Sequence, residues 1–282
     1  MTAGQASGGA NTVTGPLRGA GVLVTGASRG LGRDLSIELA RRGARVALVA
    51  RDQEALAELA SRTGGQWFAA DLADTAQIAP LIERIEHDFG PIDVVINNAA
   101  VSTLAPHVDH TTEQLVRLMS VNLTAPAEIA RVVIPRMEAR GRGHIVNIAS
   151  LGGVIAIPRL AGYGASKAGL THFTCILREE LRASPVHLTL VQLGAIEGTG
   201  MYDEVMASPM VSRLVDRRGA TGIRMAEPSG SVARKIVDGI ERGRAEIVLP
   251  RAATGLHLLR QAPALLARLL SRQGSDRRPS SS

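Results

Sequence analysis

Short apolar runs alternate with longer amphipathic segments from about residue 20 of this 282-residue chain. The runs are rich in β-branched residues and almost continuously apolar, which is typical of strands buried on both faces of a sheet. We expect seven such strands, at residues 21–26, 44–50, 66–70, 93–98, 144–150, 186–192 and 246–250.

The segments between these strands place apolar residues on one helical face. We expect helices near residues 30–43, 52–62, 74–89, 111–139, 161–183 and 228–242. Buried strands that alternate with helices predict an α/β fold, because parallel strands need a crossover and the crossover is right-handed. The expected architecture is a doubly wound, Rossmann-type parallel sheet of seven strands, and no linker interrupts the single domain over 18–250.

Four segments lie outside this alternation. Residues 1–17 are rich in Gly, Ala, Ser and Thr and are expected to form a flexible leader. Residues 193–227 form a long connection of the kind that often serves as a substrate lid. Residues 251–270 predict an amphipathic helical extension, split into two short helices by Pro263, and 271–282 a disordered tail.

Charge and composition exclude several classes of protein. The net charge of +6 is concentrated in residues 251–282, so the body of the chain offers no basic surface for nucleic acid. Aromatic residues make up 2% of the chain, too few for a base-stacking surface. Cys175 is the single cysteine, which fits a reducing compartment, and neither a signal peptide nor a spanning segment is apparent. We therefore expect a cytoplasmic protein.

The leucine-rich and arginine-rich extension at 251–270 leaves two interpretations. Its apolar residues either pack beside the lid or across a subunit interface, or they lie shallowly in an anionic membrane surface. We favour packing over membrane association.

The stretch "TGASRGLG" at 25–32 follows the first strand and opens the first helix. Glycines in such a turn let the backbone approach a pyrophosphate, which then lies at the N-terminus of the helix. A glycine turn alone can serve only packing, but a turn between strand and helix favours a dinucleotide.

Further motifs follow in order along the chain. They are Gly26, Gly30 and Gly32 in a TGxxxGxG pattern, "NNAA" at 97–100, Ser150 at the end of the fifth strand, and Tyr163 four residues before Lys167. Together they resemble the short-chain dehydrogenase/reductase family over residues 19–250, in particular its NADP-preferring carbonyl reductases. The resemblance implies that Tyr163 is the acid/base and that Lys167 lowers the pKa of Tyr163 and contacts the nicotinamide ribose.

The same resemblance implies that Ser150 polarises the substrate carbonyl and that Asn122 holds a water that connects Lys167 to solvent. Asn122 shares a helical face with Leu115 and Met119, and its other interpretation is a local helix irregularity near Pro126.

The expected cofactor is NADP(H). An NAD-specific relative has an acidic residue where this chain has Ala50, whereas Arg29 and Arg51 are placed to clamp a 2′-phosphate. Asp52 is expected to cap the following helix instead. The remaining cofactor-binding residues implied by the resemblance are Ser28, Leu31, Asp71 at the adenine amino group, Leu72, Asn98 near the adenosine ribose, Gly194, Ile196 and Thr199.

One segment departs from the family pattern. Relatives often have Pro-Gly after the sixth strand and then a Thr that contacts the carboxamide, but here Leu193 replaces the proline and Thr199 comes one residue late. The role of Thr199 and the geometry of the lid are therefore open.

The sequence thus predicts an NADP(H)-dependent enzyme that transfers a hydride to or from a carbonyl or alcohol, in a homodimer or homotetramer. Apolar residues after Ser150 (Val154, Ile155, Ile157) and in the lid (Met201, Tyr202, Val205, Met206, Met210, Val211, Leu214) favour a small hydrophobic substrate. Two alternatives are an epimerase or dehydratase of the same family and a non-catalytic NADP(H)-sensing protein. No metal site is expected, because the histidines lack metal-like spacing.

Overall fold

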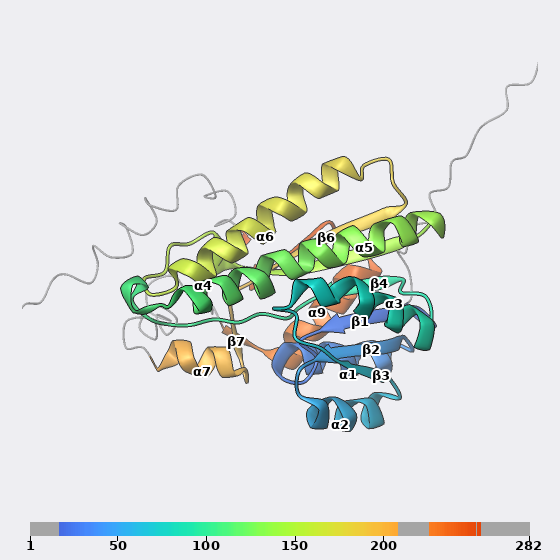
Figure 1. Cartoon of the computed structure of the whole chain (residues 1–282), viewed down its shortest axis with the longest axis horizontal. Coiled ribbons are helices and arrows are strands. Elements are labelled where there is room, and N and C mark those ends of the chain that lie inside the picture. Colours follow the sequence, from blue (N-terminus) through green and yellow to red (C-terminus); the bar gives the residue numbers. More distant parts are fainter. Residues whose placement is uncertain (1–16, 208–225, 252, 255–282) are drawn as a thin grey trace, which may run out of the picture.

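A parallel sheet of seven strands forms the centre of the computed structural model, which describes residues 17–207, 226–251 and 253–254 (Figure 1). The strand order is β3-β2-β1-β4-β5-β6-β9, and all neighbouring pairs are parallel. The strands are β1 (Gly21–Thr25), β2 (Arg45–Ala50), β3 (Gln66–Ala69), β4 (Val94–Asn97), β5 (Gly143–Ser150), β6 (Val186–Leu193) and β9 (Glu246–Leu249). The predicted doubly wound sheet is confirmed, and each strand ends within one residue of its predicted position.

Helices cover both faces of the sheet (Figure 1). One face packs against α1 (Gly30–Arg41), α2 (Gln53–Thr63) and α9 (Ser229–Glu241). The other face packs against α3 (Ile78–Asp88), α5 (Ala125–Ala139) and α6 (Ala161–Glu180). Successive strand residues point to opposite faces, so Val22 and Val24 of β1 lie in the first core while Leu23 lies in the second.

Local sequence explains where helices begin and end. The Asp52 carboxylate accepts a hydrogen bond of 3.0 Å from the Ala55 N–H, which confirms it as the N-cap of α2. Gly64 ends the same helix in the left-handed conformation at φ 66°. The Asp74 side chain, in contrast, makes no capping bond, and a 3₁₀ helix, Thr75–Gln77, precedes α3.

The long helix expected over 111–139 is divided. It begins as α4 (Thr112–Met119), passes through a π-helical turn at Ser120–Thr124, and continues as α5. Two further 3₁₀ turns, His107–Asp109 and Leu151–Gly153, lie at the same end of the molecule as the carboxyl ends of the strands.

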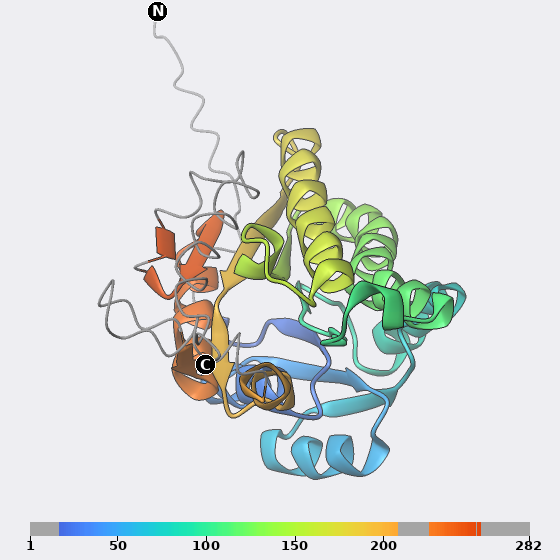
Figure 2. The same ribbon diagram turned by 90° about the vertical axis from the view of Figure 1, so that its left-hand side faces the viewer.

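The strand order reverses between β1 and β4, and a doubly wound sheet opens a crevice at the carboxyl ends of the strands where this happens. Figure 2 looks onto this end of the molecule, where α7 (Gly200–Met206) and the start of α6 face the viewer. The connection expected to be a lid contains, in its described parts, α7 and a small parallel sheet of β7 (Ala195–Glu197) and β8 (Ala226–Pro228). Its residues 208–225 lie outside the described structure.

The predicted ends of the chain are described only in part. Leu17, placed in the leader by the sequence, is 1% exposed and packs in the core. Residues 1–16, most of the extension at 251–270 and the whole tail at 271–282 lie outside the described residues. Within the described parts, no helix combines the length and apolar character needed to span a membrane.

Candidate active site

The glycine turn connects β1 to α1 at the reversal of strand order. Gly26 and Gly30 have φ values of 66° and 54°, which residues with a side chain rarely adopt. A Cβ on Gly32 would lie 2.1 Å from the Gly26 carbonyl oxygen, so only glycine permits this packing. Arg29, at the N-cap of α1, makes no side-chain capping bond, and the first turn of α1 contains no acidic residue. The N-terminal N–H groups of α1 therefore suit an anion.

Asn98 holds this turn against the end of β4. Its side-chain nitrogen donates to the Thr25 carbonyl at 2.9 Å and to the Gly26 carbonyl at 3.3 Å. The backbone N–H groups of Asn98 and Ala99 both donate to the Thr25 hydroxyl, at 3.0 Å each. Asn98 thus lies beside the glycine turn, while Asn97 is hydrogen-bonded to Asn147 within the sheet.

Close packing brings the start of α6 to the end of β5. A Cβ on Gly153 would lie 2.6 Å from the Ala168 nitrogen, and one on Gly164 would lie 2.9 Å from the Gly152 oxygen. Because these positions are glycines, α6 approaches the turn after Ser150 almost at backbone contact. The Ser150 hydroxyl accepts a hydrogen bond of 3.0 Å from the Gly152 N–H and lies within 3.3 Å of the Leu193 carbonyl.

Tyr163 and Lys167 lie one turn apart on α6 and are both buried, at 9% and 2% exposure. The Lys167 Nζ donates to the Ile148 carbonyl of β5 at 2.8 Å. The Tyr163 side chain is hydrogen-bonded to Ser150. Three of the predicted catalytic side chains are therefore brought together at the carboxyl end of β5.

Burial dominates the electrostatics of this pair. It raises the pKa of Tyr163, and the hydrogen bond with Ser150 opposes that rise only in part. It also lowers the pKa of Lys167 to about 8. For Tyr163, removing the phenolate from water outweighs the hydrogen bond with Ser150, so the direction of this pKa is set by burial.

Asn122 lies at the centre of the π-helical turn and is 0% exposed. Its Oδ1 accepts from the Val101 N–H at 2.8 Å, and its Nδ2 donates to the Val101 carbonyl at 2.9 Å. Nδ2 also donates to the Ser166 hydroxyl at 3.0 Å, and that hydroxyl donates to the Tyr163 carbonyl at 2.7 Å. The helix irregularity considered for Asn122 is therefore present, and it links the chain after β4 to the backbone of the Tyr–Lys helix.

The face assigned to Asn122 needs correction. Met119 is 38% exposed rather than buried, while Leu118 is 2% exposed. The π turn begins directly after Met119 and contains more residues per turn than an α-helix, so α-helical spacing does not relate Asn122 to Met119.

The predicted cofactor residues spread along the same edge of the sheet. Arg29 and Arg51 are exposed, at the glycine turn and directly after β2, and Ser28 is half-buried. Leu31 and Leu72 are buried, at 6% and 7% exposure.

Asp71 lies just beyond the carboxyl end of β3 and forms an ion pair of 2.9 Å with Arg117 of α4. Burial acts to raise the pKa of Asp71, but hydrogen bonds from the Ala73 N–H and Arg117, together with the charges of Arg117 and Arg51, lower it overall. Asp71 is thus kept ionised.

The segment after β6 turns at Gly198, which has a φ of 79°. The Thr199 hydroxyl donates to the Ile196 carbonyl at 2.9 Å and accepts from the Tyr202 N–H at 3.2 Å. A Cβ on Gly30 would lie 3.1 Å from the Thr199 methyl group, so Thr199 contacts the glycine turn. Thr199 therefore precedes α7, accepts a hydrogen bond from its first turn and lies against the glycine turn.

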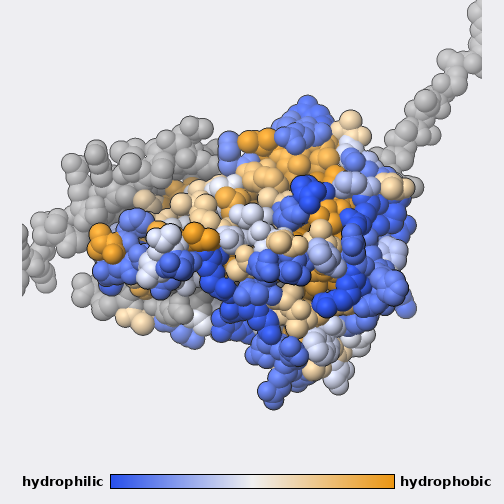
Figure 3. All heavy atoms as spheres, viewed as in Figure 1, coloured by the Kyte–Doolittle hydropathy of each residue, from blue (hydrophilic) through white to orange (hydrophobic). Residues whose placement is uncertain are grey.

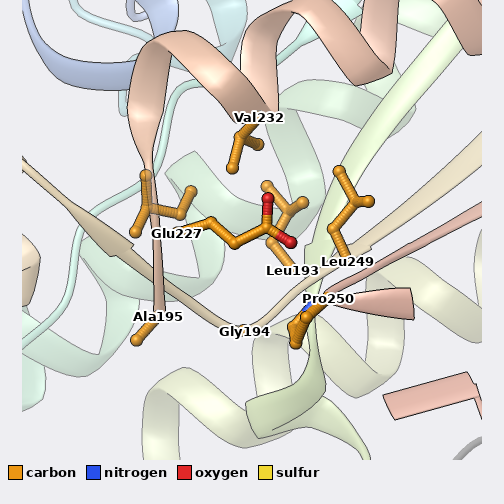
Figure 4. Close-up of a pocket in the computed structure, with 8 residues that line it drawn as sticks. Leu193, Gly194, Ala195, Glu227, Val232, Leu249 and Pro250 are labelled. Carbon is orange, nitrogen blue, oxygen red and sulfur yellow. The ribbon is translucent and has the colours of Figure 1, made fainter. Parts of the chain in front are cut away.

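A small apolar pocket lies beneath Gly194, between β6, β9 and α9 (Figure 4). Leu193, Leu249 and Val232 line it, and the Glu227 side chain points among them. Glu227 is paired with Lys235. Leu193, at the place of the family's proline, thus fills part of the core below the turn.

The apolar residues after Ser150 do not all face the site as predicted. Val154 and Ile155 are 4% and 9% exposed, and Ile155 packs with Leu151 and Ala253. Only Ile157 is half-buried, and it also packs against the cluster that contains Tyr163. Cys175 of α6 is also half-buried.

Sequence reasoning missed two polar residues at this site. Ser166 is 0% exposed and hydrogen-bonded to both Asn122 and the backbone of Tyr163. Its position directly before Lys167 on a buried helical face was the available signal. Arg117 of α4 contacts Asp71 in the connection after β3, and nothing local in the sequence shows that contact.

A doubly wound sheet with a glycine turn at its reversal point is the architecture of dinucleotide-binding proteins, and here the same edge carries a buried Tyr–Lys pair. The family model described as short chain dehydrogenase matches residues 20–209, and the chain belongs to this oxidoreductase family. The resemblance seen in the motifs is thereby confirmed.

Two curated relatives resemble most of the chain. Ketoacyl reductase HetN from a Nostoc species is 34% identical over 83% of this chain and 79% of its own length. Dehydrogenase/reductase SDR family member 7B from Bos taurus is 31% identical over 94% of this chain and 84% of its own length.

Two solved structures are similar as well. A metagenomic short-chain oxidoreductase in complex with NADP is 37% identical, with a TM-score of 0.62 over 71% of this chain and 91% of that one. A short-chain dehydrogenase from Streptomyces avermitilis has a TM-score of 0.74 over 92% of this chain and 98% of that one, and at 23% identity it supports the fold alone.

Proposed function

We propose that this protein is an NADP(H)-dependent oxidoreductase that interconverts a carbonyl and an alcohol of a hydrophobic substrate, with Tyr163 as acid/base. The observation that carries the proposal is the group formed by the half-buried Ser150 and the buried Tyr163 and Lys167 beside the glycine turn. A nicotinamide bound there supplies the hydride. The remaining chemistry, which is to hold the carbonyl and to move a proton, belongs to these side chains.

Each side chain has a role that its contacts support. Ser150 and Tyr163 are hydrogen-bonded to each other, so their hydroxyls can converge on one carbonyl oxygen. The raised pKa of Tyr163 keeps its proton in place near neutral pH, which suits donation during reduction. Lys167, anchored on the Ile148 carbonyl, places its ammonium group near the same helix face. Asn122 and Ser166 fix the backbone at Tyr163.

The preference for NADP(H) rests on Arg29 and Arg51. Both are exposed at the edge where the adenosine ribose is expected, and no acidic residue ends β2. Two guanidinium groups attract a 2′-phosphate, which a carboxylate would repel. The NADP complex of the similar metagenomic enzyme supports the same choice.

A hydrophobic substrate is proposed because the surroundings of Tyr163 are apolar. Its ring packs with Leu118 and Leu160, and the partly buried residues Val101, Leu104 and Ile157 border that cluster. These three side chains offer contact area without a charge that could hold a substrate carboxylate.

A homodimer or homotetramer is proposed from the outer surface of α5 and α6. Apolar side chains gather there in the surface view, over the two helices (Figure 3). Ile176 is 48% exposed, and Phe173, Leu177 and Ile134 are only partly buried. Size-exclusion chromatography with light scattering tests this proposal, because Ile176→Glu should then yield monomers.

The cytoplasm remains the proposed location.

The test of function is NADPH oxidation, followed at 340 nm, with carbonyl compounds graded by size and polarity. Tyr163→Phe retains the ring but removes the proton donor, so turnover should fall by roughly 100-fold or more. NADPH should still bind to the variant, which shows that the fold is intact. Near-normal turnover by Tyr163→Phe would refute the assignment.

A further inference from the structure

The Ser166 hydroxyl connects α6 to the π-helical turn. It donates to the Tyr163 carbonyl at 2.7 Å and accepts from the Asn122 side-chain nitrogen at 3.0 Å. Because a hydroxyl has a single proton, these two bonds together fix its orientation. Ser166 is 0% exposed, so bulk water cannot replace either bond.

The far end of this connection is held by the central sheet. Asn122 exchanges two hydrogen bonds with the backbone of Val101, at 2.8 and 2.9 Å. Val101 lies three residues after Asn98, whose backbone and side chain both donate to Thr25 at the end of β1. The bonds of Ser166 therefore tie the backbone of Tyr163 to the ends of β1 and β4 rather than to a surface loop.

The first turn of α6 depends on such a connection because its own sequence is a poor helix former. Tyr163 stands between Gly162 and Gly164, and glycine is among the least favourable residues in a helix. A larger residue at Gly164 is excluded, since its Cβ would lie 2.9 Å from the Gly152 oxygen. The Ser166 bond to the Tyr163 carbonyl restrains a segment that cannot be stiffened by its own side chains.

We propose that Ser166 is a positioning residue for proton transfer, which holds the backbone of Tyr163 so that the phenol stays beside Ser150. This inference rests on the proposed role of Tyr163 as acid/base. A proton donor has to lie within hydrogen-bond reach of the carbonyl oxygen, and a shift of about 1 Å is enough to slow the reaction severely. Loss of the Ser166 hydroxyl should therefore slow the proton step and leave the binding of NADPH unchanged.

Thr174 provides a matched control on the same helix. It is also 0% exposed, and its hydroxyl donates to the Leu170 carbonyl at 2.6 Å and accepts from the Asn147 side-chain nitrogen at 2.9 Å. Ser166→Ala and Thr174→Val each remove one buried hydroxyl with the same two kinds of hydrogen bond. Both should lower the melting temperature by about 2–8 °C, but only Ser166→Ala removes a bond to the backbone of the tyrosine.

The experiment is steady-state NADPH oxidation by the full-length protein below both melting temperatures, with the best carbonyl compound of the graded series. Ser166→Ala should lower kcat about tenfold and change KM and the Kd for NADPH by less than about twofold. The solvent isotope effect on kcat in D₂O should increase, because proton donation then limits turnover more strongly. Thr174→Val should keep the kcat and the isotope effect of the wild type. Ser166→Cys preserves most of the volume and a weak donor, and it should show a smaller loss of the same kind.

Three results would overturn the inference. Equal turnover of Ser166→Ala and Thr174→Val would show that Ser166 contributes to folding alone. A raised KM or Kd with unchanged kcat would assign Ser166 to ligand binding, and an unchanged isotope effect would remove the link to the proton step. An active Tyr163→Phe variant would refute the proposed function as well, whereas an inactive Tyr163→Phe beside a fully active Ser166→Ala would refute this inference alone.

Discussion

Replacing Asn122 by Ala removes three hydrogen bonds from the π-helical turn. The Val101 N–H and carbonyl lose partners at 2.8 and 2.9 Å, and Ser166 loses a donor at 3.0 Å. Ser166 keeps its bond to the Tyr163 carbonyl. The substitution therefore leaves two backbone groups unpaired beside a fully buried position.

An unpaired buried polar group costs about 1–3 kcal/mol. Val101 is only half-buried, so water satisfies part of the loss, and we expect the free energy of unfolding to fall by about 3 kcal/mol. For a chain of this size that corresponds to a decrease of about 6–12 °C in melting temperature. Turnover should fall as well, because the backbone of Tyr163 loses its connection to the π turn.

The assay is urea unfolding followed by circular dichroism, paired with NADPH oxidation well below the melting temperature. Asn147→Ala is the matched control, since Asn147 is another fully buried asparagine. Its amide bonds only the side chains of Asn97 and Thr174, at 2.8 and 2.9 Å. The control should lose stability but retain turnover.

A loss below about 1 kcal/mol with unchanged turnover would refute this reasoning, because it would mean that the π turn relaxes at no cost. Asn122→Asp provides a second check. Its carboxylate cannot donate to the Val101 carbonyl, but a protonated carboxyl can, so burial should raise its pKa above the unfolded value. That variant should therefore become more stable as the pH falls from 7 towards 5.

Three further predictions concern the cofactor site and its lysine. Replacing Arg29 and Arg51 together by Ala should weaken NADPH at least tenfold and leave NADH nearly unchanged in a binding titration, and equal effects would contradict the clamp. Lys167→Met should abolish NADPH oxidation without loss of stability at pH 7. Because burial lowers the pKa of Lys167 from 10.5 to about 8, the unfolded chain binds the extra proton between these values, so wild-type stability should rise with pH there. Urea unfolding at pH 8 and pH 10 should show that rise in Lys235→Met but not in Lys167→Met. Gly32→Ala should lower both melting temperature and NADPH affinity, since its Cβ would lie 2.1 Å from a carbonyl oxygen, and an unaffected variant would show that the turn is adaptable.

The sheet could be predicted from sequence because its strands are short apolar runs between helical segments, and such runs indicate buried strands without knowledge of the rest of the fold. Helix boundaries were less certain, and the clearest failure is the single helix expected over 111–139. A π turn depends on hydrogen bonds from Asn122 to Val101, and those form only when the chain after β4 lies against the helix. Apolar periodicity contains no such information.

In the candidate site, too, local features could be predicted from the sequence, whereas features that depend on distant contacts could not. Tyr163 and Lys167 could be predicted because their spacing of four places them on one helix face, whatever the rest of the fold does. Arg117 could not, since its partner Asp71 lies 46 residues away and approaches from a different element. The burial that raises the pKa of Tyr163 could not be predicted either, because it depends on the whole fold.

The chain has two lysines, and the structure places them in opposite surroundings. Lys167 is 2% exposed, whereas the side chain of Lys235 is 44% exposed. An amine-reactive ester added to the folded protein should therefore acylate Lys235 and spare Lys167, and mass spectrometry can count the two adducts separately. Every acylation of Lys167 then records one opening of the site, with Lys235 on the same molecule as the reference for reagent activity.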